Sequence, residues 1–340
     1  MKKFYAVVGN PPYQETMIGT SDSPLYDSFM DEAYKTSDRV ELITPGRFLF
    51  RAGKTSKEWN DKMLSDQHLK VLQYEPESSL IFPNTSIKGG IAVTYRDANK
   101  EFGAIGIFTL YPELKNFASK IIPHLEQGHL TDIIYLQNRF NLQTLYSDFP
   151  KEKEKISSNG KERRIVSSAF DKLSVFKSQK ETSDSVKILG LTGANKRTYK
   201  WILRSYIEDN GNFELYKVVV PKANGKGEFG ERLSNPTILE PYTGYTQSFI
   251  GIGSLKTYIE AQSTLKYIKT KFVRALLSTL KITQDNPPEK WEYIPLQDFS
   301  ASSDIDWSQS VADIDRQLYA KYGLSDDEIE FIESHVKEMD

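Results

Sequence analysis

Short apolar runs alternate with helical patterns over the first 110 residues. Four runs rich in β-branched and aromatic residues predict strands, at 4–8, 40–43, 69–74 and 91–95. Apolar residues at helical spacing predict helices at 23–34, where Leu25, Phe29 and Ala33 share one face, and at 58–64. Residues 104–110 are a predicted hairpin partner of the strand at 91–95. This alternation predicts an α/β sheet.

The pattern changes beyond residue 110. Short predicted strands at 186–191, 199–205, 214–220 and 246–252 are separated by Gly, Asn and Pro. Residues 254–280 then predict one helix, and the last 25 residues predict another, which starts at a capping box formed by Ser325 and Glu328. We therefore expect two domains. The first, 1–125, is α/β, and the second, 126–340, is mixed α+β with an acidic helical tail.

Composition excludes several kinds of site. Cysteine is absent, which excludes disulfides and thiol nucleophiles, and the four histidines include no pair at metal-ligand spacing. We therefore expect no metal site. No apolar run approaches the ~20 residues that span a bilayer, and the apolar stretch at the N-terminus is too short for a signal peptide. These features predict a soluble, cytoplasmic protein.

Charge is distributed unevenly along the chain, although the net charge is only -2. Residues 151–204 contain 14 Lys and Arg against 6 Asp and Glu, whereas residues 285–340 contain 4 against 15. A basic segment can bind polyanions through phosphate contacts and counterion release, or it can simply be a solvated surface. The acidic tail is interpreted as a solvated helical surface.

Asn10-Pro11-Pro12-Tyr13 directly follows the first predicted strand. In open α/β sheets, ligands bind beyond the carboxyl ends of strands. Asn10 presents a side-chain oxygen acceptor, and the two prolines stiffen the loop and remove backbone donors. Two acceptors that converge on an exocyclic amine would hold both of its hydrogens, while Tyr13 stacks on the attached ring. The loop therefore predicts a site for a planar amine nucleophile.

These residues resemble motif IV of the amino-methyltransferases that modify the N6 amino group of adenine in DNA. Segments 6–14 (AVVGNPPYQ), 25–33 (LYDSFMDEA), 42–47 (LITPGR) and 88–94 (KGGIAVT) look like successive motifs IV to VIII. The order is similar to that of type II and IIG restriction-modification methylases. Segment 253–283, which contains YIKTKFVR at 267–274, and WEYIPLQDF at 291–299 resemble the end of a target-recognition domain.

The resemblance implies roles for matching positions. Asn10 and the Pro11 carbonyl would accept hydrogen bonds from the adenine amine, Pro12 would belong to the same catalytic loop, and Tyr13 would stack on the flipped base. Phe82 is a candidate second aromatic clamp, with core packing as the alternative. The remaining candidates are cations that could contact phosphates or bases, or could be solvated: Lys88, Lys266, Lys269, Lys271 and Arg274.

The implied cofactor is S-adenosylmethionine, but the expected glycine-rich turn (motif I) is missing, since only nine residues precede Asn10. Gly251-Ile-Gly253 lies in the recognition-like segment, where such a turn is not expected. The implied fold is thus a partial Rossmann-like methyltransferase sheet that starts at motif IV. Its first strand would be a bare apolar edge, which predicts a second polypeptide carrying the motif I half.

Three functions remain open from the sequence. The chain could be the base-holding and DNA-recognition part of an adenine methylase that acts on double-stranded DNA. It could instead be a DNA-binding specificity subunit without catalysis of its own. The third alternative is a methylase that acts on RNA or protein, because NPPY also occurs in methylases of glutamine and RNA.

Overall fold

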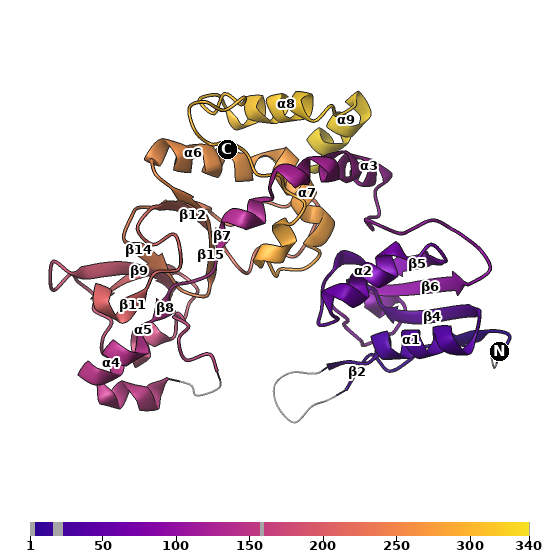
Figure 1. Ribbon diagram of the computed structural model, residues 1–340, viewed down its shortest axis with the longest axis horizontal. Coiled ribbons are helices and arrows are strands. Elements are labelled where there is room, and N and C mark those ends of the chain that lie inside the picture. The colour runs from indigo at the N-terminus through magenta and orange to yellow at the C-terminus, as the bar shows by residue number, and fades with distance from the viewer. Residues whose placement is uncertain (1–3, 16–22, 157–159, 340) are drawn as a thin grey trace. The chain divides into compact units, whose positions relative to one another are not determined.

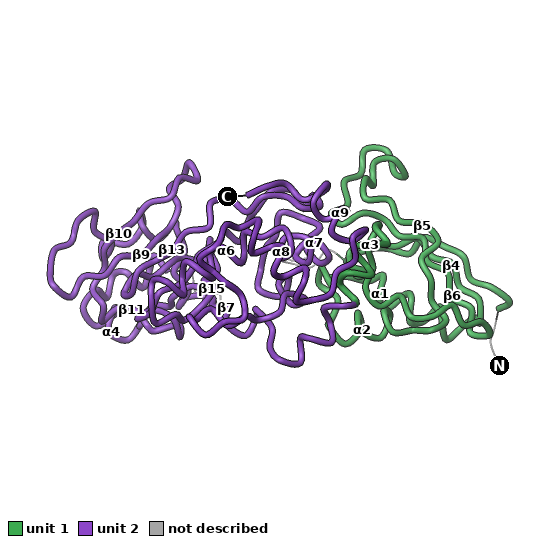
Figure 2. Tube along the Cα trace, turned by 90° about the horizontal axis from the view of Figure 1, so that it is seen from above, with its two compact units in different colours: residues 1–119 green, residues 120–340 purple. Residues whose placement is uncertain are grey.

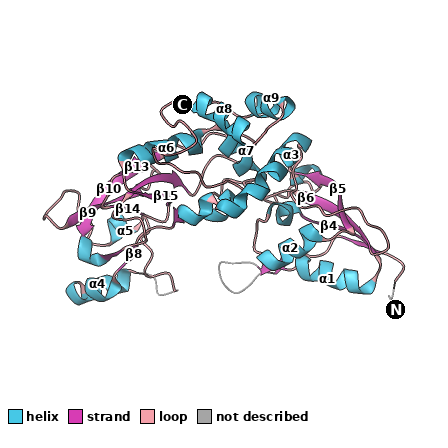
Figure 3. Ribbon diagram, turned by 45° about the horizontal axis from the view of Figure 1, so that its top comes forward, coloured by secondary structure: helices cyan, strands magenta, loops and turns pink. Residues whose placement is uncertain are grey.

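The computed structural model describes residues 4–15, 23–156 and 160–339. The chain divides into two compact units, Met1–Ser119 and Lys120–Asp340, which are coloured separately in Figure 2. Both units combine helices and strands (Figure 3), and each is described by itself. This mixed architecture is compatible with the predicted α/β fold.

Unit 1 is built on a four-stranded sheet of order β1-β4-β6-β5 (Figure 1). β1 pairs in parallel with β4, whereas β6 pairs antiparallel with β4 and with β5. The strands at 40–43, 69–74 and 91–95 and both helices are confirmed. The strands and α2 are slightly longer than predicted, and α1 starts three residues later and ends two residues later than predicted. The elements of this unit are β1 (Val7–Gly9), β2 (Gln14–Glu15), β3 (Ser23–Pro24), α1 (Tyr26–Thr36), β4 (Arg39–Pro45), α2 (Lys57–Ser65), β5 (Leu69–Glu75) and β6 (Ile91–Asp97), with single-turn 3-10 helices at Gly46–Phe50 and Ser78–Leu80.

Helix α1 buries a different face from the predicted one. Tyr26 and Met30 are buried, whereas Phe29 is 46% exposed. The Tyr26 ring packs edge-on against Trp59 of α2, with ring centroids 5.9 Å apart, and lies 6.4 Å from Phe48. This aromatic cluster fixes the rotation of α1, because burying three large rings together removes more apolar surface from water than burying Leu25 and Ala33.

One prediction about the sheet is wrong. Residues 104–110 form no strand, because β6 already has β4 on one side and β5 on the other. The first strand lies at the edge of the sheet, as the resemblance implies: β1 pairs only with β4 among the described residues, and Val8 is 76% exposed. Tyr5, just before β1, is 82% exposed. The sheet of unit 1 therefore ends in an open apolar edge.

Unit 2 contains two main sheets, of order β10-β9-β14 and β13-β12-β15-β7. A core cluster that includes Phe140, Phe170, Ile188 and Phe213 lies beside the first of them. The predicted strands at 186–191, 199–205, 214–220 and 246–252 are present, with shifted bounds. The strands of unit 2 are β7 (Ile134–Tyr135), β8 (Arg139–Phe140), β9 (Ser185–Leu191), β10 (Arg197–Leu203), β11 (Ile207–Glu208), β12 (Tyr216–Pro221), β13 (Thr237–Leu239), β14 (Thr243–Tyr245) and β15 (Phe249–Leu255).

The helix predicted at 254–280 is two helices. Thr270 has extended backbone angles, with φ -55° and ψ 150°, and its hydroxyl accepts a hydrogen bond from the Val273 N–H. It therefore ends one helix and caps the next. The C-terminal segment likewise forms two helices, and the Ser325–Glu328 capping box is confirmed. The helices after β6 are α3 (Pro112–Ile121), α4 (Leu142–Asp148), α5 (Ala169–Lys172), α6 (Tyr258–Lys269), α7 (Lys271–Leu280), α8 (Val311–Lys321) and α9 (Asp326–His335).

A buried carboxylate ties α8 to the start of α7. Asp315 is 2% exposed, and its two oxygens accept hydrogen bonds from the Lys271 and Phe272 N–H groups at 3.0 and 2.9 Å. These donors belong to the first turn of α7, where N–H groups lack intrahelical partners. Burial raises the pKa of Asp315 to about 7, against the opposing effect of these hydrogen bonds.

Asp315 is therefore expected to make stability depend on pH. An unfolded Asp titrates near pH ~3.9, so between pH ~4 and about 7 the native state holds a proton that the unfolded state has lost. The contribution of Asp315 to the free energy of unfolding should fall as pH rises through this window, by up to ~1.4 kcal/mol per pH unit, and level off above it. Asp315→Asn should remove this fall.

Urea unfolding at a series of pH values measures the effect. The control is Glu330→Gln, which changes an exposed carboxylate of α9 and should keep the slope of the natural protein. An Asp315→Asn variant with the slope of the natural protein would contradict the assignment.

Candidate functional site

A cavity of about 500 Å³ opens where β1 and β4 end. Because the two strands are parallel, their carboxyl ends lie at the same edge of the sheet. Asn10, directly after β1, and Pro45, the last residue of β4, both line the cavity. Its volume lies in the range typical of small-molecule sites, ~300–1,000 Å³.

The cavity contains four of the residues predicted from the sequence. Asn10, Tyr13, Phe82 and Lys88 all line it, although more than 70 positions separate the first from the last. Pro11 and Pro12 are not among its described lining residues, and Pro12 is exposed. The NPPY loop thus contributes its first and last side chains, and the two prolines set the spacing between them.

Hydrogen bonds hold the two walls of the cavity. The Tyr13 carbonyl accepts a hydrogen bond from the Leu25 N–H at 3.1 Å, which fixes the loop against the start of α1. On the other wall, the buried Ser78 hydroxyl donates to the Thr85 carbonyl and accepts from the Ile87 N–H, at 2.9 and 2.8 Å. The segment that carries Phe82 and Lys88 is therefore anchored from inside the unit.

Two tyrosines face a partly desolvated environment. Burial raises the pKa of Tyr13, and the Asn10 side chain opposes the rise. Burial raises the pKa of Tyr26 to about 12, with opposing effects of Thr55 and Arg47. Both phenols are neutral at physiological pH, so neither adds negative charge to the cavity.

The charged side chains that line the cavity are all cations. Arg47, Lys54 and Lys88 are present, and no carboxylate occurs among the described lining residues. Arg47 and Lys54 are not among the site residues predicted from the sequence. Arg47 lies two positions after β4, at the end of the segment 42–47 that resembles a methylase motif. This position in the sequence could have identified it as a candidate site residue.

The predicted cations of α6 and α7 are engaged inside unit 2. Arg274 is 1% exposed and donates to the Lys269 and Gly230 carbonyls, at 3.0 and 3.3 Å, which does not fit the predicted contact with a phosphate. The Lys266 ammonium donates to three carbonyls, at residues 307, 308 and 309. Lys271 pairs with Glu333, with 2.5 Å between Nζ and Oε2. Lys269 is half-buried at the end of α6.

The basic segment 151–204 contributes a second hollow, on unit 2. β9 and β10 pair antiparallel, so that Lys187 lies opposite Trp201. The ammonium groups of Lys187 and Lys180 lie 5.3 and 5.7 Å from the centre of the Trp201 ring. These residues line a hollow of about 760 Å³. Cations interleaved with an aromatic ring are typical of surfaces that bind nucleic acid.

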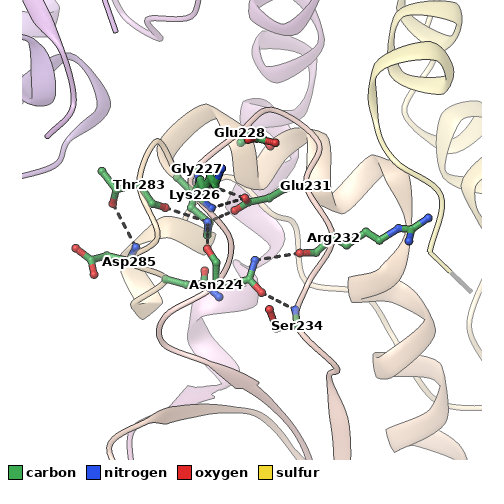
Figure 4. A network of polar contacts seen from close by, with 12 residues as sticks. Asn224, Lys226, Gly227, Glu228, Glu231, Arg232, Ser234, Thr283 and Asp285 are labelled. Atoms are coloured by element: carbon green, nitrogen blue, oxygen red, sulfur yellow. Dashed lines mark hydrogen bonds and ion pairs between the residues drawn. The ribbon is translucent and has the colours of Figure 1, made fainter. Parts of the chain in front are cut away.

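A glycine-rich run that was not singled out in the sequence follows β12. Gly225-Lys226-Gly227-Glu228-Phe229-Gly230 has the G-x-G-x-x-G spacing of a nucleotide turn. The carboxylate of Glu231 fills this turn: it accepts hydrogen bonds from the Lys226 and Gly227 N–H groups, at 2.8 and 3.2 Å (Figure 4). Gly225 has φ +58°, and a Cβ there would lie 1.9 Å from Glu231 Oε2, so a larger residue would displace the carboxylate from the turn.

The same turn is closed by a buried ion pair. Lys281 is 2% exposed, and its ammonium contacts Glu231 and the Asn224 and Thr283 carbonyls. Asn224 in turn binds the backbone at residues 232 and 234. No helix follows the turn, since the chain continues to β13. This run is therefore a structural loop with an internal counter-ion.

The described residues present no cofactor turn of the expected kind. The two G-x-G runs are the filled loop after β12, which continues to β13, and Gly251–Gly253, which is part of strand β15 and does not form the turn between that strand and α6. The described residues also contain no cluster of three or more His, Asp or Glu that could hold a metal ion. None of the described helices is long and apolar enough to cross a membrane.

Comparisons with known proteins bear on unit 1. Residues 1–82 match the family model of Eco57I restriction-modification methylases. The N-terminal part of the chain is therefore related to restriction-modification methylases. The match includes the NPPY loop and ends at Phe82, so it covers most of the walls of the cavity.

One curated protein shows weaker similarity. The chain is 25% identical over 146 residues to one component of an ATP-dependent helicase/nuclease of Lactococcus lactis subsp. cremoris (strain SK11). The aligned part is 43% of this chain and 11% of that protein. The chain thus spans a small fraction of that relative.

The filled turn predicts a large stability effect. Glu231→Gln should leave the buried Lys281 ammonium without its counter-ion and cost about 3 kcal/mol, as expected when one partner of a buried pair is removed. The control, Glu228→Gln, lies in the same loop but breaks an exposed pair with Lys337, both side chains being 56% exposed. It should cost less than about 1 kcal/mol. Chemical unfolding measures both, and equal effects would show that the pair is not what stabilises the loop.

Proposed function

We propose that this chain is a component of a site-specific DNA adenine N6-methyltransferase of a restriction-modification system. Unit 1 holds the flipped adenine, and unit 2, within the proposed recognition domain 126–340, reads the DNA. The observation that carries the proposal is the cavity at the end of β1, where Asn10, Tyr13 and Phe82 meet. Support comes also from the match of residues 1–82 to restriction-modification methylases.

The proposed mechanism uses acceptors and aromatic rings. The Asn10 side-chain oxygen accepts one hydrogen of the adenine amine, and the carbonyl of Pro11, which is not among the described lining residues, accepts the other when the base is bound. These hydrogen bonds draw the nitrogen lone pair out of conjugation with the ring, so that the nitrogen becomes nucleophilic. Tyr13 stacks on one face of the base, and Phe82 is the proposed clamp for the other. A base is not required in the transfer step, because the amine loses its proton after the methyl group arrives.

We further propose that the motif I half of the sheet joins unit 1 along β1 and brings S-adenosylmethionine. The exposed edge of β1 supports this proposal, because an unpaired apolar strand is a site for pairing with another strand. The partner segment would come from a second polypeptide. The methyl group is then supplied by the cofactor on that segment, and the described residues of unit 1 bind and orient the base.

A second candidate is a DNA-binding specificity subunit that does not catalyse methyl transfer. Among the described residues, neither G-x-G run forms an open turn between a strand and a helix, and this favours the second candidate. In that case the cavity residues would have no effect on a partner enzyme's activity.

Asn10→Ala decides between the two. With the cofactor half supplied, it should lower methyl transfer to DNA by at least about 100-fold, the size of effect expected when a transition-state hydrogen bond is lost. DNA affinity should change little, because phosphate contacts dominate it. Transfer of a radiolabelled methyl group and a gel-shift assay measure the two quantities. Full methylation by the variant would favour the second candidate, a specificity protein without catalysis.

The β1 edge predicts association of the purified chain. Sedimentation velocity should show oligomers that grow with concentration, because exposed apolar edges pair with one another. Val8→Lys should shift the distribution toward monomer, since a charged side chain blocks such pairing. Lys100→Gln, an exposed change elsewhere in unit 1, should not. A monodisperse monomer at high concentration would contradict the open-edge argument.

A further inference from the structure

We propose that the cavity contains a phosphate subsite formed by Arg47 and Lys88, which binds the nucleic-acid backbone beside the base held by Asn10 and Tyr13. The proposal rests on the function proposed above and narrows its substrate class. It assigns the site to a phosphate-bearing nucleic acid and not to the neutral side chain of a protein glutamine.

The charge of the cavity is the first argument. Arg47, Lys54 and Lys88 line it with no carboxylate among the described lining residues. Among the described residues, the ion pairs of unit 1 give neither Arg47 nor Lys88 a carboxylate partner. Cations grouped in one cavity repel one another, and this repulsion is relieved when an anion binds. The cavity is therefore complementary to a negatively charged ligand.

The second argument is how Arg47 is held. It belongs to the 3-10 turn Gly46–Phe50 directly after β4, and its carbonyl accepts a hydrogen bond from the Ala52 N–H at 3.0 Å. Its aliphatic stem packs against Gly53, where an added Cβ would lie 2.4 Å from Arg47 Cδ. Gly53 has φ +100°, which favours glycine. The backbone and the stem therefore anchor this side chain before a ligand arrives.

Arg47 lines the cavity together with the buried Tyr26. The charge of Arg47 opposes the rise in the pKa of that tyrosine. Arg47 is a partly buried residue, and a partly buried charge interacts with an anion more strongly than an exposed one, because water screens it less. Its planar donors also match two phosphate oxygens at once. Lys88, which is exposed, supplies a second charge at the rim.

A neutral amide would not use these charges. Asn10, Tyr13 and Phe82 are enough to hold a flat amide or amine, so a glutamine side chain leaves Arg47 and Lys88 without a counterpart. A nucleotide satisfies both parts of the cavity, because its base and its phosphates are joined through one sugar. The geometry thus favours the nucleic-acid alternative over the protein alternative.

Small probes test the subsite independently of DNA sequence. Calorimetric titration of the full chain compares 2′-deoxyadenosine, 2′-deoxyadenosine 3′,5′-bisphosphate and the abasic 1,2-dideoxyribose 3,5-bisphosphate. The adenine bisphosphate should bind at least about tenfold more tightly than the nucleoside, as expected for a charge-assisted contact. Raising the salt concentration should lower the affinity for the bisphosphate and leave the affinity for the nucleoside unchanged.

Variants assign the effect to residues. Arg47→Gln and Lys88→Gln should each lower the affinity for the bisphosphate, and the loss should be about tenfold for Arg47→Gln. Neither variant should change the affinity for the nucleoside. Arg47→Lys should recover part of the loss, because it restores the charge without the planar donors. Lys100→Gln, an exposed lysine of unit 1 outside the cavity lining, is the matched control and should bind all probes as the natural protein does.

Failure of this proposal differs from failure of the function on which it rests. If nucleoside and bisphosphate bind equally, or if the bisphosphate does not bind, the phosphate subsite is overturned. If the adenine and abasic bisphosphates bind equally and Asn10→Ala has no effect on either, the subsite stands and the base site falls. A third arm uses S-adenosylmethionine: if Arg47→Gln weakens its binding and leaves the bisphosphate unaffected, the anion is the cofactor carboxylate, and the proposal is overturned.

Discussion

The parallel pairing of β1 with β4 is the constraint on which the candidate site depends. Three residue pairs, from Val7–Val40 to Gly9–Leu42, align the two strands so that their carboxyl ends meet. Asn10 and Arg47 are 37 positions apart in the chain and line one cavity only because of this register. A shift of one residue would turn the side chains of β1 to the other face of the sheet and separate Asn10 from its neighbours.

Much of unit 1 follows from its sequence, because its central strands are continuous apolar runs bounded by turn residues. The apolar run of β1 looks the same whether a neighbouring strand is present or not, so the exposure of β1 could be expected only from the resemblance to methylases. The predicted buried face of α1 was wrong because that face is set by a tertiary contact, between Tyr26 and Trp59. The spacing of apolar residues within the helix gives no information on such a contact. The strand expected at 104–110 failed because β6 has both neighbours in place.

In unit 2, the helical spacing of apolar residues predicts one helix where the structure has two, with the break at Thr270. Apolar positions continue through it at helical spacing, while its backbone leaves the helical region and its hydroxyl caps α7. The exposure of the cations in this region could not be predicted either. Arg274 lies in a segment rich in Lys, which suggests a solvated surface, and yet it is 1% exposed. For the site, the NPPY loop indicated Asn10 and Tyr13. Arg47 could have been predicted from its place after β4, whereas Lys54 is recognised as a lining residue only in the folded unit.

Glu231 gives the loop after β12 an unusual character. Its carboxylate is in effect a ligand attached to its own receptor, at an effective concentration that a free anion in solution does not match (~mM or higher for short tethers). Dialysis cannot empty such a site, and a nucleotide would have to compete with an occupant that stays covalently linked at this effective concentration. A sequence that looks like a phosphate turn thus becomes, through one neighbouring residue, a place that disfavours phosphate.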